Sequence, residues 1–593
     1  MATCIHSHML MAFQDGMCTP SRACTSSLYC KLSDVIYSRH SHRLTTLSHS
    51  ITFQSTTLHA HRYFGLHRSN IRRYLIHRIS SSSSRTSTAK MKILFLCTAH
   101  NSLSQRLYLA LSPAHDITIE YALSDELMVS AAALAKPDLI ICPFLTTLVP
   151  QEVYDRYLTL IVHPGPPGDA GPSALDWVLL GDDGSIDDAQ QALKALHTGA
   201  CAPGRSHWGV TILQAIEEFD AGPVWAFDQF AIDIDEAGLT KSELYRSYIT
   251  QAAIAATLAA VLHIQTLASG NPITPFLTAP SQYGHLSVTA SQPFQGGKTH
   301  HRPLLKAAER DFDLTKHTSQ HVSRSIRCGD SQPGAMSKCF GRGLYVYGGQ
   351  IEDGAGMSKS SFACTDTTTV ILGVRNGAVC VKTVDGGIWI THVRRLKSKS
   401  DNALWPKVPA TTALVELGIL NAAQILALDW PLPSGWALSP CRTFQEVYID
   451  FDGDVAYLYF DFYNGAMSSE QCSQLIAAME YIITRSSTSP VKAVVLMGGS
   501  YFSNGIHLNV IEASSDPSME SWLNINRIND VVYFLLHDFS ACNIATVSAI
   551  RSNAAAGGVA LATACDVVIA GADVVLNPAY RAVGLSGSEY HTV

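Results

Sequence analysis

The chain has 593 residues, of which 47% are hydrophobic and 15% charged, and its formal net charge is -7. This length is too great for one hydrophobic core, so three or more domains are expected. The acidic balance argues against a nucleic-acid-binding protein. The short apolar run at 252–264, which Thr257 and His263 interrupt, predicts a buried helix instead of a membrane span.

Residues 1–90 differ in composition from the rest of the chain. They carry 11 Lys and Arg against two acids, Asp15 and Asp34, and they are rich in Ser, Thr and His. An acid-poor, Arg- and Ser-rich segment is typical of transit peptides, which would place the protein in mitochondria. The alternative is a true start at Met91, for which a cytoplasmic location is expected. Both interpretations predict that residues 1–90 are disordered or removed.

Residues 91–270 are predicted to form a doubly wound α/β domain. Apolar strands are expected at 92–97, 139–142 and 158–162, with a helix at 103–111 that Asn101 or Ser102 can cap. Strands that alternate with helices indicate a parallel sheet, whose ligands bind beyond the carboxyl ends of the strands. No Gly-x-Gly-x-x-Gly follows the first strand, so a dinucleotide is not predicted.

His163 and Asp220 are the candidate catalytic residues of this domain. They lie in the segments 162–165 (Val-His-Pro-Gly) and 219–222 (Phe-Asp-Ala-Gly). A histidine can stabilise a tetrahedral oxyanion, and a carboxylate can hold the imidazole and relay protons. An isolated histidine at a strand end is more often only packed. Together with Gly-Val-Thr at 209–211, however, these segments resemble the active site of folate-dependent formyltransferases.

The formyltransferase resemblance implies a 10-formyltetrahydrofolate substrate and an Asn, His and Asp set. Ile161 occupies the position of the Asn and can donate no side-chain hydrogen bond, so the typical mechanism of those enzymes is not expected. By the same resemblance, the residues expected to bind the substrates follow the first three strands: Asn101, Ser102, Gln105, Arg106, Pro143, Phe144, Leu145 and Asp169.

Residues 271–400 are predicted to form a small β-rich, barrel-like domain after a linker at 272–291. A helix is expected at 322–327, and strands are expected at 343–347, 369–374, 377–383 and 387–392. This order resembles the C-terminal domain of formyltransferases. The basic run at 394–399 is more often a solvated face than a phosphate site. Residues 401–442 are predicted to be a linker with one helical stretch.

Residues 443–593 resemble a crotonase domain, the fold of enoyl-CoA hydratases, and are expected to form an incomplete version of it. Strands are predicted at 447–451, 455–460 and 493–497, with a helix at 469–484. The segments 502–508 and 554–559 match the crotonase pattern, in which two backbone N–H groups polarise a thioester carbonyl. The donors are expected to be Asn504 and Gly557, since glycine allows close approach of the thioester.

The acids of the hydratases are absent from this domain. Their positions correspond to Ala560 and Tyr580, which leaves no general base for adding water to a double bond. A hydratase is therefore not expected, and other acyl-CoA chemistry is. The candidate polar groups near the acyl carbon are Tyr580, Glu589 and Tyr590.

The motifs of residues 91–593 together resemble the HypX/HoxX hydrogenase-maturation family, in which the Asn before the histidine is also missing. The resemblance implies formyl transfer from 10-formyltetrahydrofolate to coenzyme A, then release of carbon monoxide from formyl-CoA for a metalloenzyme client. The alternatives are a conventional 10-formyltetrahydrofolate-dependent formyltransferase or hydrolase, and a non-catalytic folate- or CoA-binding remnant. The 15 cysteines include no Cys-x-x-Cys pair, so no metal site is predicted. Small-molecule substrates are expected, and nucleic acid and membrane partners are not.

Overall fold

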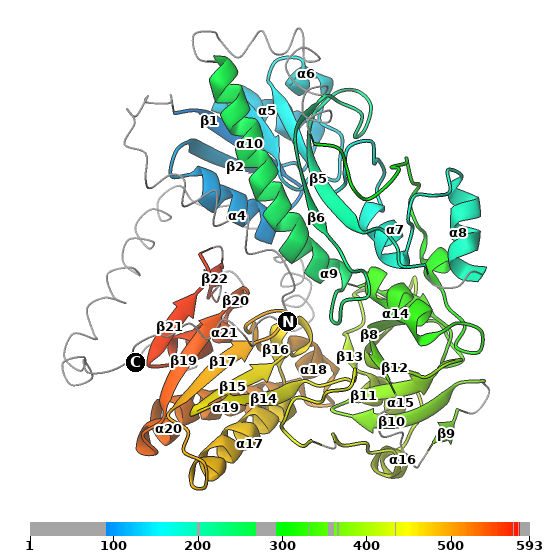
Figure 1. Cartoon of the computed structure of the whole chain (residues 1–593), viewed down its shortest axis with the longest axis vertical. Helices are drawn as coiled ribbons and strands as arrows, with labels where there is room; N and C mark the ends of the chain where they lie inside the picture. The colour runs from blue at the N-terminus through cyan, green and yellow to red at the C-terminus, as the bar shows by residue number, and fades with distance from the viewer. Residues whose placement is uncertain are drawn as a thin grey trace, which may run out of the picture. The chain divides into compact units, whose positions relative to one another are not determined.

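The computed structural model describes residues 90–198, 202–268, 292–330, 333–353, 361–364, 367–432, 434–572, 574–578 and 580. Within these ranges the chain builds three large sheets, each with its own hydrophobic core, and two short two-stranded sheets (Figure 1). The predictions for residues 1–89, for the linker at 272–291 and for Glu589 and Tyr590 lie outside the described residues.

The first domain contains a six-stranded sheet in the order β2-β1-β3-β4-β5-β6. Strands β1 to β4 are parallel, and β5 and β6 add an antiparallel hairpin. All four residues of β3 are buried, as expected for a parallel strand covered on both faces. The strands are β1 (Lys92–Cys97), β2 (Asp116–Tyr121), β3 (Leu139–Cys142), β4 (Thr159–His163), β5 (His207–Gln214) and β6 (Val224–Ala231).

Helices cover this sheet and connect its strands. They are α4 (Ser102–Leu111), α5 (Asp125–Ala135), α6 (Gln151–Tyr154), α7 (Ala174–Leu180), α8 (Ala189–Thr198), α9 (Lys241–Leu244), the π-helical turn η3 (Tyr245–Ile249) and α10 (Thr250–Ala268). The alanine-rich face of α10 is buried and packs on β5, β6 and α4, which confirms the buried helix expected there. By length and composition, the continuous helix Lys241–Ala268 is the one described helix that could cross a membrane, and half of its apolar window is buried in this domain.

The second domain is an antiparallel sheet in the order β7-β8-β12-β11-β10-β9, with β13 beside β12. Helix α14 packs on β8. These two elements overlap the helix and the first strand that the sequence predicts for this domain. The elements are η4 (Ala307–Arg310), α14 (Ser319–Cys328), β7 (Ala335–Ser337), β8 (Leu344–Glu352), β9 (Phe362–Ala363), β10 (Val370–Arg375), β11 (Ala378–Lys382), β12 (Gly387–Arg395) and β13 (Val408–Pro409).

The segment 401–442 differs from the linker that its prolines predict. It contains β13 and two helices, α15 (Ala410–Glu416) and α16 (Ala422–Ala427). Leu414 and Leu428 are buried in the core of the second domain. Apolar burial therefore joins residues 408–428 to the second domain, and the predicted single helical stretch is wrong.

The third domain is a five-stranded sheet in the order β14-β15-β17-β19-β21, parallel except for the β14–β15 hairpin. Two short pairs, β16–β18 and β20–β22, lie beside it. Its strands are β14 (Val447–Asp452), β15 (Val455–Phe460), β16 (Ala466–Met467), β17 (Ala493–Gly498), β18 (Gly505–Ile506), β19 (Ala545–Ile550), β20 (Ala554–Ala555), β21 (Val567–Ala570) and β22 (Leu576–Asn577). Its helices are η5 (Tyr463–Gly465), α17 (Ser469–Ser486), α18 (Leu508–Ala513), α19 (Pro517–Tyr533), η6 (Phe534–Asp538), α20 (Phe539–Ala541) and α21 (Gly557–Thr563).

Candidate active sites

The first candidate site lies at the carboxyl edge of the first sheet. Strands β1, β3 and β4 are neighbours there, so the residues that follow them meet at one edge. Asn101 caps α4 just after β1, and its Oδ1 accepts a hydrogen bond from the Ser104 N–H at 3.1 Å. Segment 143–145 follows β3, and His163 is the last residue of β4. The topology therefore brings the predicted catalytic histidine and the predicted substrate-binding segments together.

The His163 ring lies between two carboxylates. Its Nδ1 atom is 3.3 Å from Oδ1 of Asp220, and its Nε2 atom is 3.1 Å from Oδ2 of Asp169. The side chains of His163 and Asp169 are almost fully buried, and that of Asp220 is 15% exposed. The predicted His163–Asp220 pair forms, and Asp169, which was expected to bind a substrate, contacts the ring of this candidate catalytic histidine. Sequence pattern missed this role because nothing in the local motif shows which way Asp169 turns.

Backbone geometry holds the two carboxylates in place. A Cβ atom at Gly165 would lie 2.3 Å from Oδ2 of Asp169 and 2.5 Å from Nε2 of His163, so only glycine leaves room for this contact. The Thr211 hydroxyl donates to the Gly165 carbonyl at 2.7 Å. Asp220 has a φ of 54°, a left-handed conformation that aspartate tolerates better than most residues, and it accepts a weak hydrogen bond from the Gly171 N–H.

The two carboxylates keep the His163 ring charged at neutral pH. Burial alone would lower the pKa of His163, but the hydrogen bonds to Asp169 and Asp220 and their negative charges raise it to about 9. Burial alone would raise the pKa of Asp220, but the hydrogen bond and charge of His163 bring it below the usual value. Both N–H groups of the ring face carboxylates, so its action on a developing oxyanion comes from its positive charge, which a buried site screens little.

The substrate-binding candidates differ in how their side chains are used. Arg106 is buried and donates from Nη1 to the carbonyl of Arg246 at 2.9 Å, so part of its guanidinium stabilises the contact between α4 and the π-helical turn η3. Asn101 Nδ2 donates to the Tyr245 hydroxyl at 3.4 Å, and Phe144 meets the Tyr245 ring edge-on. Tyr245 was missed by sequence reasoning because the π-helical turn that carries it has no simple periodic signal. Half-buried side chains at this edge are Ser102, Gln105 and Leu145, and Pro143 is buried.

The second candidate site is formed by two backbone segments of the third domain. The Ala555 N–H donates to the Ser503 carbonyl at 2.9 Å. A Cβ at Gly558 would lie 2.0 Å from the Ser503 oxygen, and a Cβ at Gly505 would lie 2.8 Å from the Gly557 nitrogen. These glycines allow the close backbone approach that the predicted thioester site requires.

The two predicted N–H donors of this site are used differently. The Asn504 N–H donates to the Gly465 carbonyl at 2.7 Å, so its predicted role as a free donor is wrong for this conformation. Gly557 is the first residue of α21, where an N–H has no partner within the helix. Ala560 is buried in α21, and Tyr580 is half-buried.

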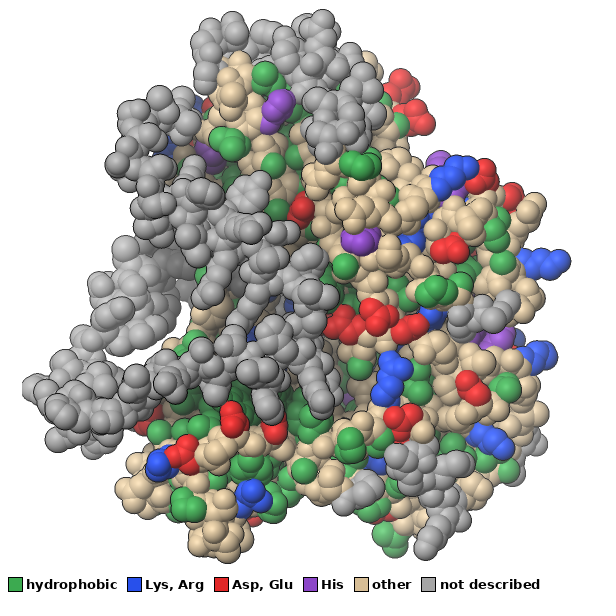
Figure 2. Space-filling model, in the orientation of Figure 1, with side chains coloured by type: hydrophobic (Ala, Val, Ile, Leu, Met, Phe, Trp, Pro, Cys, Tyr) green, Lys and Arg blue, Asp and Glu red, His purple; other side chains and the backbone are tan. Residues whose placement is uncertain are grey.

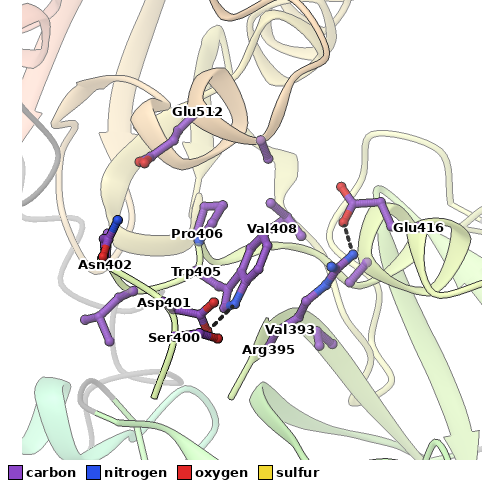
Figure 3. A pocket seen from close by; sticks show the side chains of 14 residues that line it. Val393, Arg395, Ser400, Asp401, Asn402, Trp405, Pro406, Val408, Glu416 and Glu512 are labelled. Carbon is purple, nitrogen blue, oxygen red and sulfur yellow. Dashed lines mark hydrogen bonds and ion pairs between the residues drawn. The ribbon is translucent and has the colours of Figure 1, made fainter. Parts of the chain in front are cut away.

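A pocket of about 550 Å³ lies apart from both sites, between β12, the 400–408 segment and α18 (Figure 3). An Arg395–Glu416 ion pair lines one side, and Trp405 donates to Asp401. None of the predicted site residues lines this pocket.

Figure 2 shows acidic and basic side chains interspersed over the described residues of the visible face.

Three histidines, His197, His317 and His321, lie close enough for their ring nitrogens to share a metal ion. Other contacts already use two of the rings. His197 Nε2 lies 2.8 Å from the Glu309 carbonyl, and His317 Nδ1 accepts from the Asp313 N–H at 3.1 Å. The His317 and His321 ring centroids are 4.1 Å apart, and the two ring planes are tilted by 39°. These contacts are those of a packed histidine cluster.

Comparison with known proteins decides the family. The enoyl-CoA hydratase/isomerase family matches residues 454–589. The hydrogenase maturation factor HoxX of Bradyrhizobium diazoefficiens is 34% identical over 508 residues, which cover 85% of this chain and 75% of HoxX. The chain belongs to the HypX/HoxX family.

A solved structure of the HypX/HoxX family supports this family assignment. HypX from Aquifex aeolicus in complex with tetrahydrofolic acid is 35% identical, with a TM-score of 0.67, over 85% of this chain and 76% of that chain. A methionyl-tRNA formyltransferase of Natranaerobius thermophilus is 23% identical over 197 residues, which cover 33% of this chain and 53% of that enzyme. The predicted family and the predicted fold class, formyltransferase-like and crotonase-like domains in one chain, are confirmed.

Proposed function

We propose that this HypX/HoxX chain transfers a formyl group from 10-formyltetrahydrofolate to coenzyme A and releases carbon monoxide from the formyl-CoA. The observation that carries the proposal is the buried His163 ring between Asp169 and Asp220. It lies in a chain that also keeps the paired thioester segments without the hydratase acids. The tetrahydrofolic acid bound to Aquifex aeolicus HypX supports folate as the donor.

In the first step the thiol sulfur of coenzyme A attacks the formyl carbon. The carbonyl oxygen becomes an oxyanion, and the positive charge of the buried His163 ring stabilises it electrostatically. The C–N bond to the folate then breaks, the C–S bond remains, and the thiol proton ends on the folate nitrogen. Asp169 and Asp220 keep the ring charged and fix its orientation throughout.

In the second step the C–S bond of formyl-CoA breaks. The formyl hydrogen passes to sulfur as a proton, and the carbonyl leaves as carbon monoxide, so coenzyme A is regenerated and no oxidant is needed. We infer that the Gly557 N–H, at the start of α21, polarises the thioester carbonyl in this step. The carbon monoxide would serve a metalloenzyme client, as the hydrogenase-maturation name of HoxX suggests.

The deciding experiment follows the formyl label. The protein is incubated with 10-formyltetrahydrofolate carrying a labelled formyl group, with and without coenzyme A, and carbon monoxide is captured by deoxyhaemoglobin. We expect labelled carbon monoxide only when coenzyme A is present. Labelled formate in both reactions would identify a hydrolase, and unchanged donor would identify a binding remnant.

A further inference from the structure

The π-helical turn η3 has one residue facing each candidate site. The hydroxyl of Tyr245 accepts from Asn101 Nδ2 at the folate edge. The next residue, Arg246, is buried, and its guanidinium lies 4.2 Å from the centre of the Tyr501 ring in the third domain. Arg246 is ion-paired with Glu243 on the same helix. Since π-helical turns are uncommon and cluster at functional sites, this placement is informative.

A second contact joins the same two regions. Asn553 Nδ2 donates to the hydroxyl of Ser102, the first residue of α4, at 3.1 Å. The two oxygen atoms of Asn553 accept hydrogen bonds within the third domain. Its Oδ1 accepts from the Val575 N–H at 3.0 Å, and its carbonyl accepts from the Phe502 N–H at 3.0 Å. Asn553, which directly precedes the 554–559 segment, therefore links the N-terminus of α4 to Phe502 of the other segment, through its side chain on one side and its backbone carbonyl on the other.

Tyr501 also limits the position of the predicted oxyanion donor. A Cβ added to Gly465 would lie 2.6 Å from the Tyr501 Cβ and 3.3 Å from the Asn504 nitrogen, so the three residues are packed against one another. In this arrangement the Asn504 N–H is held by the Gly465 carbonyl. Tyr501 therefore packs directly against Gly465, the residue whose carbonyl holds that N–H.

The geometry points to Arg246, Tyr501 and Asn553 as positioning residues that make thioester binding depend on occupancy of the folate edge. This inference rests on the proposed function, because it takes folate and coenzyme A as the two ligands. A ligand that orders Asn101, Ser102 and Tyr245 also orders their partners in the third domain. The second ligand then loses less conformational entropy on binding, which predicts positive coupling. Coupling of this kind is reciprocal, so coenzyme A must tighten folate binding by the same factor.

The test measures coenzyme A affinity by titration calorimetry, with and without saturating tetrahydrofolate, which carries no formyl group and so permits no turnover. In the wild-type chain we expect tetrahydrofolate to tighten coenzyme A binding at least about five-fold, the lower end of typical couplings. Tyr501→Leu removes the ring face under Arg246, and Asn553→Ala removes the contact to Ser102. Each is expected to bring the coupling factor close to one, while tetrahydrofolate alone binds with unchanged affinity. Tyr501→Phe keeps the ring but removes the hydroxyl that hydrogen-bonds to Arg246, so it should retain part of the coupling. Tyr481→Leu, at an exposed tyrosine of α17, is the matched control, with coupling retained.

The outcomes separate this inference from the proposed function. Coupling that persists in Tyr501→Leu and Asn553→Ala comes from direct contact between the two ligands and overturns the inference. Two ligands that bind without coupling in the wild type overturn it as well, while the proposed function stands. A wild-type chain that binds no tetrahydrofolate overturns both.

Discussion

The Nδ1 atom of His163 lies 3.3 Å from Oδ1 of Asp220, although His163 precedes strand β5 in the sequence and Asp220 follows it. Asp169 approaches the other ring nitrogen. A histidine held from both sides cannot turn its ring without breaking a charged hydrogen bond. Its orientation toward substrate is therefore fixed before any ligand arrives.

Replacing His163 by alanine is expected to abolish measurable formyl transfer. The charge of the imidazole acts on the oxyanion, which exists only in the transition state, and loss of one group that stabilises an oxyanion typically costs about 10²–10³ in rate. Tetrahydrofolate affinity should stay within a few-fold of wild type, as measured by calorimetry. His207→Ala, in strand β5, is the matched control and should keep the wild-type rate. Wild-type turnover in His163→Ala would remove the site assignment.

The stability of the first domain should depend on pH through His163. The pKa of His163 is raised from 6.5 to about 9 in the folded chain, so its stabilising contribution is full below pH 6.5 and is lost as the pH rises through about 9. That contribution is on the order of 3 kcal/mol at most. Asp220→Asn removes one carboxylate, so urea unfolding should show a larger deficit for this variant below pH 6.5 than above pH 9. A deficit that does not change with pH would contradict a charged ring.

Gly165→Ala should separate the ring from Asp169. The added Cβ would lie within 2.5 Å of both side chains, so one of them must move, and formyl transfer should fall more than folate binding. Gly453→Ala is the control, because its Cβ would meet nothing within 4 Å, although its φ of 60° makes alanine strained there. That control should lose about 1 kcal/mol of stability and keep its activity. Equal rates in the two variants would show that the His163–Asp169 contact is dispensable.

The chain should not hydrate crotonyl-CoA. Ala560 and Tyr580 occupy the positions of the two hydratase acids, and neither can activate water as a carboxylate does. Crotonyl-CoA mixed with the protein should keep its enone absorbance over hours. An authentic enoyl-CoA hydratase serves as the positive control. Loss of the absorbance at an enzymatic rate would show that the two positions are aligned incorrectly.

Local patterns predicted most of the fold. The buried run at Leu139–Cys142 and the cap at Asn101 each depend on a few adjacent residues, and the structure shows both. The segment 401–442 was mispredicted because its prolines outweighed Leu414 and Leu428 in the interpretation. Those leucines are buried in the core of the second domain. The residues that cover them lie elsewhere in the sequence, so the local pattern could not indicate this burial.

The sequence predicted which residues belong to the candidate sites, but not which of them contact one another. The motif identified His163 and Asp220, yet it could not show that Asp169 would turn toward the ring. For Asn504, the motif gave the position of the donor, and only tertiary structure revealed the Gly465 carbonyl that occupies it. Contacts of this kind depend on chain segments far apart in sequence, so no local pattern contains them.

The π-helical turn at Tyr245–Ile249 changes the direction in which the residues before α10 point around the helix axis. Each residue of an α-helix advances about 100° around the axis, so one extra residue in the turn rotates the part before it relative to α10 by roughly that angle. The alanine face of α10 can thereby face β5 and β6 while Tyr245 and Arg246 keep their own directions. Deleting a single residue here would leave a regular helix that could satisfy one of these two orientations and not both. The insertion therefore acts as a phase shift, which lets one helix serve both the core of the sheet and the site at its edge.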